Sequence, residues 1–156
     1  SAGANLALVV SLMARDAGGP EIAKQVLAYP AVDASVERPS MDLFAENHLQ
    51  TRRDVKHALG TYALNHGVDP SDWRLSPLKA ETFKGLPAVF LVSAECDAIR
   101  DDSEALTRRL MAEGVGVVHA RYAGMIHTFV QMRPAIEAAI VAQRQMADEV
   151  RRAVQA

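Results

Sequence analysis

Three short apolar segments, separated by stretches with helical spacing, most constrain what this chain can fold into. They read "KQVLAYP" (24–30), "PAVFLVSAE" (87–95) and "VGVVHARY" (115–122). The first two are almost continuously apolar, which is typical of strands covered on both faces. Helical patterns lie over 2–15, 52–65, 102–113 and 134–154. Strands that alternate with helices predict an α/β fold with a parallel sheet and right-handed crossovers.

The helical segments also predict which side chains are buried. In the last helix we expect the following residues to face inward: Ile136, Ile140, Val141, Met146 and Val150. In the helix over 102–113, the Arg108–Arg109 pair is interpreted as part of a solvated face.

Three parallel strands are few for a sheet that helices cover on both faces. The first strand would form an unpaired and very apolar edge, which is a liability in solution. We therefore interpret residues 1–156 as a partial domain, the second half of a larger sheet. The stretch over 39–83 is long for a crossover connection, and we interpret it as containing a cap or lid insertion.

Composition excludes several classes of protein. The formal net charge of −2 argues against a nucleic-acid-binding surface, which needs a basic excess. The longest apolar stretch, 4–14, is interrupted by two polar residues and is too short to span a membrane. Cys96 is the only cysteine, which excludes an intrachain disulfide and favours a reducing, cytoplasmic compartment.

Three residues suited to nucleophilic catalysis follow the expected elements. Asp97 stands at the end of the second strand, His127 lies just beyond the third, and Ser1 immediately precedes a helix. The carboxyl ends of parallel strands carry the sites of open α/β sheets. The order Ser, Asp, His is that of α/β-hydrolases. In such a triad the histidine takes the serine proton and the carboxylate orients the histidine.

The turn before the first helix has its own requirements. A nucleophile at a sharp strand-to-helix turn tolerates only small neighbours, so Gly3 is expected to be needed for close packing. The N–H of Ala2, at the start of that helix, can point at a developing oxyanion.

The chain resembles the C-terminal half of the hormone-sensitive-lipase-like esterases, a branch of the α/β-hydrolases. The segments that carry the resemblance are "SAGANLA", "YPAVD", "LSPL", "LPAVFLVSAECDAIRDD", "EGVGV" and "RYAGMIHTF". By motif, Ser1 would be the nucleophile, Asp97 the acid, His127 the base and Ala2 an oxyanion donor. The resemblance implies a serine carboxylesterase or lipase-like enzyme that hydrolyses short- to medium-chain acyl esters without metal or cofactor. It also implies dimer surfaces on the final helix and the last strand.

The chain departs from the family pattern at its start. The Gly-Asp that precedes the serine, the His-Gly-Gly oxyanion loop and the earlier strands are absent. We therefore expect a missing N-terminal half of the same protein as a partner. That half would supply most of the oxyanion hole and half of the pocket.

Two other functions compete with the esterase. A free Ser1 α-amine could act as the base, as in N-terminal-nucleophile hydrolases, without need of Asp97 or His127. Alternatively, the chain is an inactive truncated fragment that self-associates through an exposed strand edge.

Several other polar residues are expected to have structural roles. Asp101 and Asp102 are interpreted as helix N-terminal residues, Cys96 as a small buried core residue, and Glu95 as a hydrogen-bonding residue near the site. The remaining histidines are expected at the surface or in loops, without metal-ligand spacing: His48, His57, His66 and His119.

Overall fold

A three-stranded parallel sheet forms the centre of the molecule. The computed structural model describes residues 1–155, and within them the strand order is β1-β2-β3. The strands are β1 (Gln25–Ala28), β2 (Val89–Cys96) and β3 (Val117–Ile126). The helices are α1 (Ala2–Asp16), α2 (Pro39–Leu43), α3 (Arg52–Tyr62), α4 (Arg100–Ala112) and α5 (Glu137–Gln155). Short 3-10 turns are η1 (Leu64–His66), η2 (Pro77–Lys79) and η3 (Phe129–Gln131). The expected α/β fold is confirmed.

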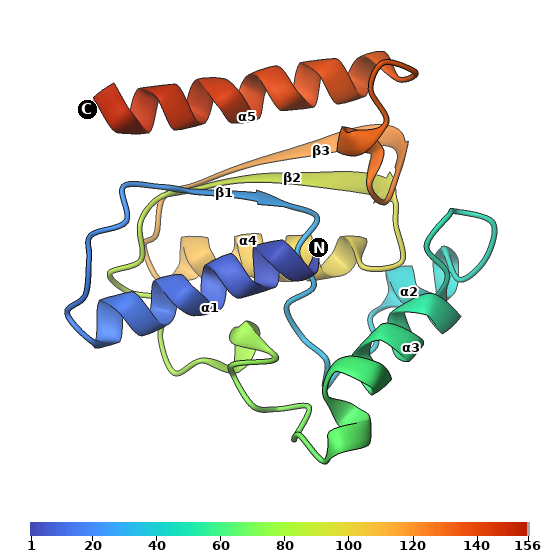
Figure 1. Cartoon of the computed structure of the whole chain (residues 1–156), viewed down its shortest axis with the longest axis horizontal. Helices are drawn as coiled ribbons and strands as arrows, with labels where there is room; N and C mark the ends of the chain where they lie inside the picture. Colours follow the sequence, from blue (N-terminus) through green and yellow to red (C-terminus); the bar gives the residue numbers. More distant parts are fainter. Residues whose placement is uncertain (156) are drawn as a thin grey trace.

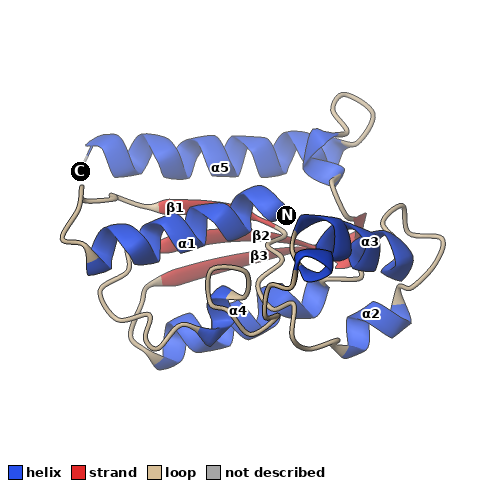
Figure 2. Cartoon of the chain, turned by 60° about the horizontal axis from the view of Figure 1, so that its bottom comes forward, coloured by secondary structure: helices blue, strands red, loops and turns tan. Residues whose placement is uncertain are grey.

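Helices cover both faces of the sheet (Figures 1 and 2). On one face, α1 and α4 pack against alternate strand residues, with Leu8, Leu27, Leu91 and Leu106 in one apolar cluster. On the other face, α5 packs against the intervening strand residues in a second cluster. The central strand β2 pairs with both neighbours, and its side chains are buried in both clusters, which explains why its sequence is apolar without alternation. In the described residues β1 is an edge strand, as expected.

The last helix is present, but its predicted inner face was partly wrong. Its fully buried residues are Ala139 and Ala142, whereas Val141 and Val150 are 41% and 49% exposed. Ile136 and Met146 pack against the same cluster as these alanines, as expected. The buried face therefore combines small and large residues and leaves Val141 and Val150 at its side.

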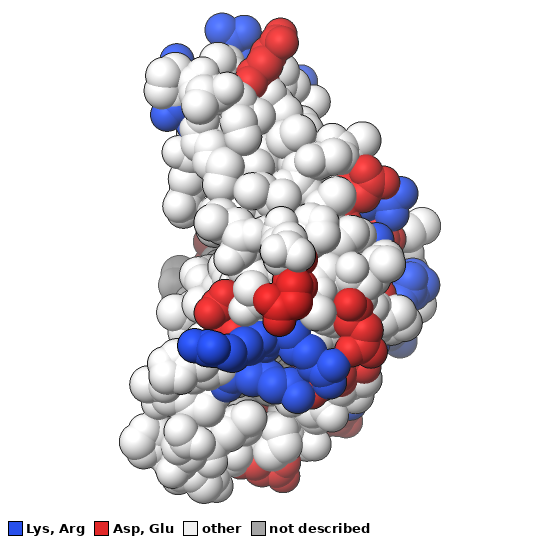
Figure 3. Space-filling view, turned by 90° about the vertical axis from the view of Figure 1, so that its right-hand side faces the viewer, with Lys and Arg blue, Asp and Glu red and all other residues white. Residues whose placement is uncertain are grey.

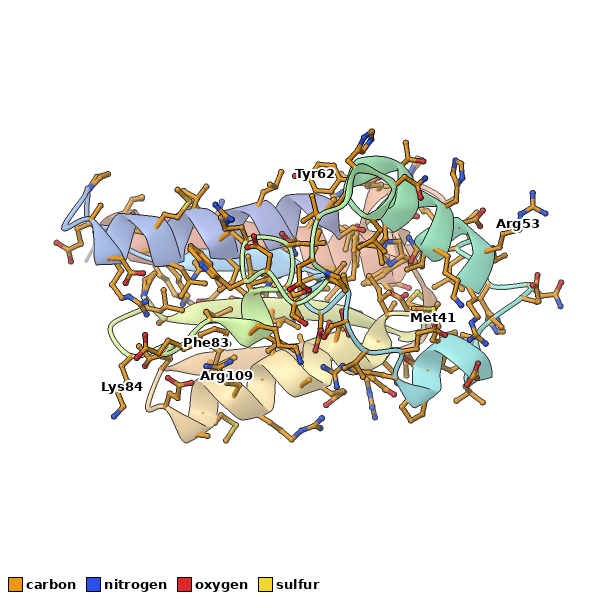
Figure 4. All side chains as sticks on the ribbon, turned by 90° about the horizontal axis from the view of Figure 1, so that it is seen from below. Met41, Arg53, Tyr62, Phe83, Lys84 and Arg109 are labelled. Carbon is orange, nitrogen blue, oxygen red and sulfur yellow. The ribbon has the colours of Figure 1, made fainter. Side chains whose placement is uncertain are left out.

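The prediction of a solvated arginine pair was wrong for Arg109. Its guanidinium lies over the Phe83 ring, 4.5 Å from the centroid (Figure 4). It donates to the carbonyls of Leu78 and Ala80 and to the Glu113 carboxylate. Arg109 thus fastens the long connection before β2 to the side of α4.

The segment over 39–83 contains α2, α3 and the turns η1 and η2. Helices α2 and α3 lie beyond the carboxyl ends of the strands (Figure 1). Their outer surface carries basic side chains bordered by acidic ones (Figure 3). Arg52 pairs with Glu37 and Asp42, and Lys56 pairs with Glu37.

Among residues 1–155, no helix is long and apolar enough to cross a membrane.

Candidate active site

The structure brings Ser1, His127 and Asp97 into one hydrogen-bonded chain. Ser1 is the N-cap of α1, Asp97 follows β2 and His127 follows β3. Since β2 and β3 are adjacent and parallel, the residues after them meet at one edge of the sheet. The distance from His127 Nδ1 to Asp97 Oδ2 is 2.7 Å, and that from His127 Nε2 to Ser1 Oγ is 3.1 Å.

Chemistry assigns the proton positions in this chain of bonds. An ionised carboxylate can only accept, so Nδ1–H donates to Asp97 and the Nε2 lone pair faces the Ser1 hydroxyl. Asp97 is buried and its second oxygen accepts from the Ile99 N–H at 2.9 Å. His127 is 2% exposed. The arrangement can therefore remove a proton from the Ser1 hydroxyl.

Backbone contacts fix Ser1 at the start of α1. Its nitrogen donates to the Ala28 carbonyl at 2.5 Å, which joins it to the end of β1. Its carbonyl accepts from the N–H groups of Ala4 and Asn5. The Asn5 side chain donates to the carbonyls of Ala31 and Leu75 at 2.7 and 2.8 Å. Asn5 is thus a site-building residue that the sequence signalled only as a polar interruption of an apolar helix.

A cavity of about 510 Å³ opens beside Ser1 and Ala2. Its walls come from α1, α2, α3 and the loops after β1 and β2. Most of the large lining side chains are apolar: Leu6, Val36, Met41, Val55, Leu59, Tyr62, Leu64, Leu75 and Ile99. Figure 4 shows Met41 on α2 and Tyr62 at the end of α3. An apolar organic group therefore fits next to the Ser1 hydroxyl.

An ionic network of Asp33, Arg38 and Asp102 forms part of the wall of this cavity. Asp102 Oδ2 accepts from the Val32 N–H at 2.8 Å, and Oδ1 accepts from Arg38 Nε at 3.1 Å. Arg38 also donates to Asp33 Oδ2 at 2.9 Å. Asp102 lies in the first turn of α4, as expected, and Arg38 is the N-cap of α2. The network therefore joins the loop after β1 and the base of α2 to the helix that follows Asp97.

The buried carboxyl of Asp102 is expected to make the unfolding free energy depend on pH. Burial raises the pKa of its carboxyl from 3.8 to about 6, although the Val32 N–H and Arg38 oppose that rise. Between these values the folded state binds more protons than the unfolded state, so stability falls as pH rises. We expect the unfolding free energy of the wild type, relative to Asp102→Asn, to fall by about 2 kcal/mol from pH 4 to 7. Urea titrations across this range measure it, and a difference that stays constant or grows with pH would contradict it.

Known proteins with a similar sequence place this chain in a family. A family model described as the alpha/beta hydrolase fold matches residues 1–131. The carboxylic ester hydrolase LipN of Mycobacterium tuberculosis is 39% identical over 137 residues, which is 85% of this chain. The chain belongs to the α/β-hydrolase family, in its hormone-sensitive-lipase-like branch.

Other members of the family give the same result. The carboxylesterase NlhH of M. tuberculosis is 32% identical over the whole chain. The crystal structure of EstE1, a thermostable carboxylesterase from a metagenomic library, superposes with a TM-score of 0.91 at 34% identity and covers all of this chain. An α/β-hydrolase from the metagenome of Lake Arreo superposes with a TM-score of 0.87 at 34% identity and covers 94%.

The chain spans only part of its relatives. It covers 36% of LipN, 50% of NlhH and 53% of EstE1, and it aligns with about their C-terminal half. The expected resemblance and the expected partial sheet are therefore both confirmed.

The expectation for Gly3 stays a prediction, because a Cβ added there would meet nothing within 4 Å among residues 1–155 and the strand expected before Ser1 lies outside them. The expectation for His119 was wrong. His119 is not a surface or loop residue. It is half-buried in β3, with Nε2 2.7 Å from Ser93 Oγ and Nδ1 3.0 Å from Thr107 Oγ1.

The remaining polar residues near the site have structural contacts. Cys96 is half-buried, less enclosed than expected. Glu95 accepts from the Gly124 N–H at 2.8 Å and so ties the end of β2 to the last residues of β3, just before His127. In the part of the chain that the structure describes, no cluster of three or more His, Cys, Asp or Glu could hold a metal ion.

Proposed function

We propose that this chain supplies the catalytic residues of a serine carboxylesterase that acts on short- to medium-chain acyl esters. The hydrogen-bonded series Ser1–His127–Asp97 is the observation that carries the proposal. In this scheme Ser1 Oγ attacks the ester carbonyl carbon while His127 Nε2 takes the hydroxyl proton. Asp97 stabilises the imidazolium that forms. The tetrahedral intermediate collapses as His127 gives its proton to the leaving alkoxide, and the alcohol departs.

Water completes the cycle. His127 takes a proton from a water molecule, whose oxygen attacks the acyl carbon of the acyl-Ser1 intermediate. Collapse of the second tetrahedral intermediate returns the proton to Ser1 Oγ and releases the carboxylic acid.

The proposal assigns Ala2 as one oxyanion donor. Ala2 is the first residue of α1, where N–H groups have no helical acceptor, and it adjoins Ser1 at the cavity. A donor of this kind is worth about 10²–10³ in kcat. Further donors are assigned to a missing N-terminal half of the same protein, because the chain matches only about half of its relatives.

The apolar cavity is assigned to the acyl group. In this assignment α2 and α3, within 39–83, form part of a cap over the substrate. A cavity of about 510 Å³ has room for a short or medium acyl chain.

One experiment tests the proposed function. The full protein encoded by the gene and the 156-residue chain are each treated with a fluorophosphonate probe and mapped by peptide mass spectrometry. We expect a single adduct on Ser1 in the full protein, and faster hydrolysis of p-nitrophenyl acetate to octanoate than of the palmitate. No adduct on the full protein would overturn the proposal.

A second candidate is self-association of the 156-residue chain. The exposed apolar face of α1 and the edge strand β1 favour it. Leu6, Val10 and Met13 on α1 are each more than half exposed, and β1 is an edge strand in the described residues. Sedimentation of the 156-residue chain over a concentration series tests this. Concentration-dependent association without an adduct would support the candidate for the isolated chain.

A further inference from the structure

The backbone of Tyr29 is in an unfavourable conformation. Tyr29 follows β1 directly and has a φ of 37°, in the left-handed region that bulky residues rarely adopt. Pro30 comes next, and a residue before proline prefers an extended backbone. Nothing in the local sequence favours this conformation, so the surrounding structure imposes it. Strained backbone of this kind is concentrated at functional sites.

The conformation changes the side of the sheet on which the Tyr29 ring lies. Side chains alternate along a strand. Leu27 packs in the cluster on the α1 side, and Val26 and Ala28 pack against the cluster on the α5 side. Continued alternation would send the Tyr29 ring to the α1 side with Leu27. The ring instead lies in the α5-side cluster and is almost fully buried.

In that position the ring contacts the histidine of the site. The ring centroids of Tyr29 and His127 are 4.7 Å apart, with the planes tilted by 55°. Behind it, Phe129 lies 6.4 Å from Tyr29, and Tyr122 lies 5.0 Å from Phe129. A row of rings therefore runs from the half-buried Tyr122 through Phe129 and Tyr29 to the imidazole. The Tyr29 N–H donates to the Val92 carbonyl at 2.6 Å and holds the Tyr29 backbone against β2.

The two hydrogen bonds of His127 do not by themselves fix its ring. Both bonds, to Ser1 and to Asp97, run from ring nitrogens, so they direct the imidazole within its plane and resist tilting only weakly. A buried aromatic ring against the imidazole resists that tilt. Burial, with a contribution from Asp97, raises the pKa of the Tyr29 hydroxyl.

We propose that Tyr29 is a positioning residue: its left-handed backbone places its ring against His127 and holds the imidazole in line with Ser1 and Asp97. The proposal rests on the proposed esterase function. It explains why the chain tolerates an unfavourable φ at an aromatic residue at the end of a strand.

The test compares two leucine substitutions in the full protein encoded by the gene. Tyr29→Leu and Phe90→Leu each remove one ring from the same buried cluster, but only Tyr29 contacts His127. We expect Tyr29→Leu to lower kcat about 10- to 100-fold with little change in KM, because a misplacement of about 1 Å costs up to about 10²-fold. Phe90→Leu is expected to lose stability to a similar degree and to keep its kcat. Tyr29→Phe retains the ring and should restore kcat to within about twofold of the wild type.

A second readout does not need turnover. The Nδ1–H proton of His127, which donates to Asp97, is followed by NMR in the wild type and the three variants. We expect its resonance to broaden or shift in Tyr29→Leu alone. If Tyr29→Leu and Phe90→Leu have the same kcat and an unchanged resonance, Tyr29 is only a core residue. If the wild type takes no fluorophosphonate and hydrolyses no ester, the esterase function fails, while the resonance still decides whether Tyr29 holds the imidazole.

Discussion

Replacement of Ser1 by alanine is expected to lower kcat about 10⁶-fold and to abolish fluorophosphonate labelling, because removing the nucleophile of a triad costs about that much. The change should leave the fold intact. The Ser1 side chain makes no capping hydrogen bond to α1, and its hydroxyl bonds to His127. Alanine therefore removes the reacting atom and little else. Initial rates with p-nitrophenyl butyrate, together with intact mass after labelling, measure both effects in the full protein.

His127→Ala is the matched variant for this prediction. If Ser1 is activated by the imidazole, His127→Ala loses as much activity as Ser1→Ala, and the double variant loses no more. If a free α-amine of Ser1 were the base, the 156-residue chain carrying His127→Ala would stay active, so this alternative is tested on that chain. The geometry favours the imidazole, because the Ser1 nitrogen donates to the Ala28 carbonyl while the hydroxyl meets His127 Nε2. An active, labelled His127→Ala variant would contradict the triad mechanism.

The parts of the fold that the sequence predicted are those set by long-range pattern. Continuous apolar runs identified the three strands, because a strand covered on both faces has no polar positions. Their alternation with helices predicted parallel pairing, and parallel pairing places the residues after β2 and β3 together. Asp97 and His127 could therefore be found from their positions alone. Ser1 was identified from its place before a helix and from the order Ser, Asp, His, on the interpretation that a strand of a larger sheet precedes it.

The parts that the sequence did not predict depend on packing and local backbone. Val141 and Val150 are as apolar as a core requires, yet Ala139 and Ala142 are the fully buried residues of α5. Tyr29 reads as the end of a strand, and only its φ of 37° moves its ring to the other face. Asn5 and Arg109 are polar residues whose partners are carbonyls far away in sequence. Such contacts have no local sequence signature.

Asp97→Asn is expected to lower kcat about 10⁴-fold, because an amide at this position favours the wrong imidazole tautomer. The structure fixes how the amide would lie. The Ile99 N–H donates to Asp97 Oδ1, and only an oxygen can accept there, so the amide oxygen must face Ile99. The NH₂ group then faces His127 Nδ1 and donates to it. The imidazole proton moves to Nε2, which can no longer take the Ser1 proton.

The control for this prediction is Asp148→Asn, which removes one carboxylate charge from an exposed position on α5. We expect it to keep the wild-type kcat, so that loss in Asp97→Asn cannot be attributed to net charge. Asp97→Asn should leave KM nearly unchanged, because Asp97 acts through His127 and does not line the cavity. An Asp97→Asn variant that keeps most of its kcat would show that another carboxylate orients His127. A variant that loses kcat yet keeps the wild-type Nδ1–H resonance would show that the tautomer is not the cause.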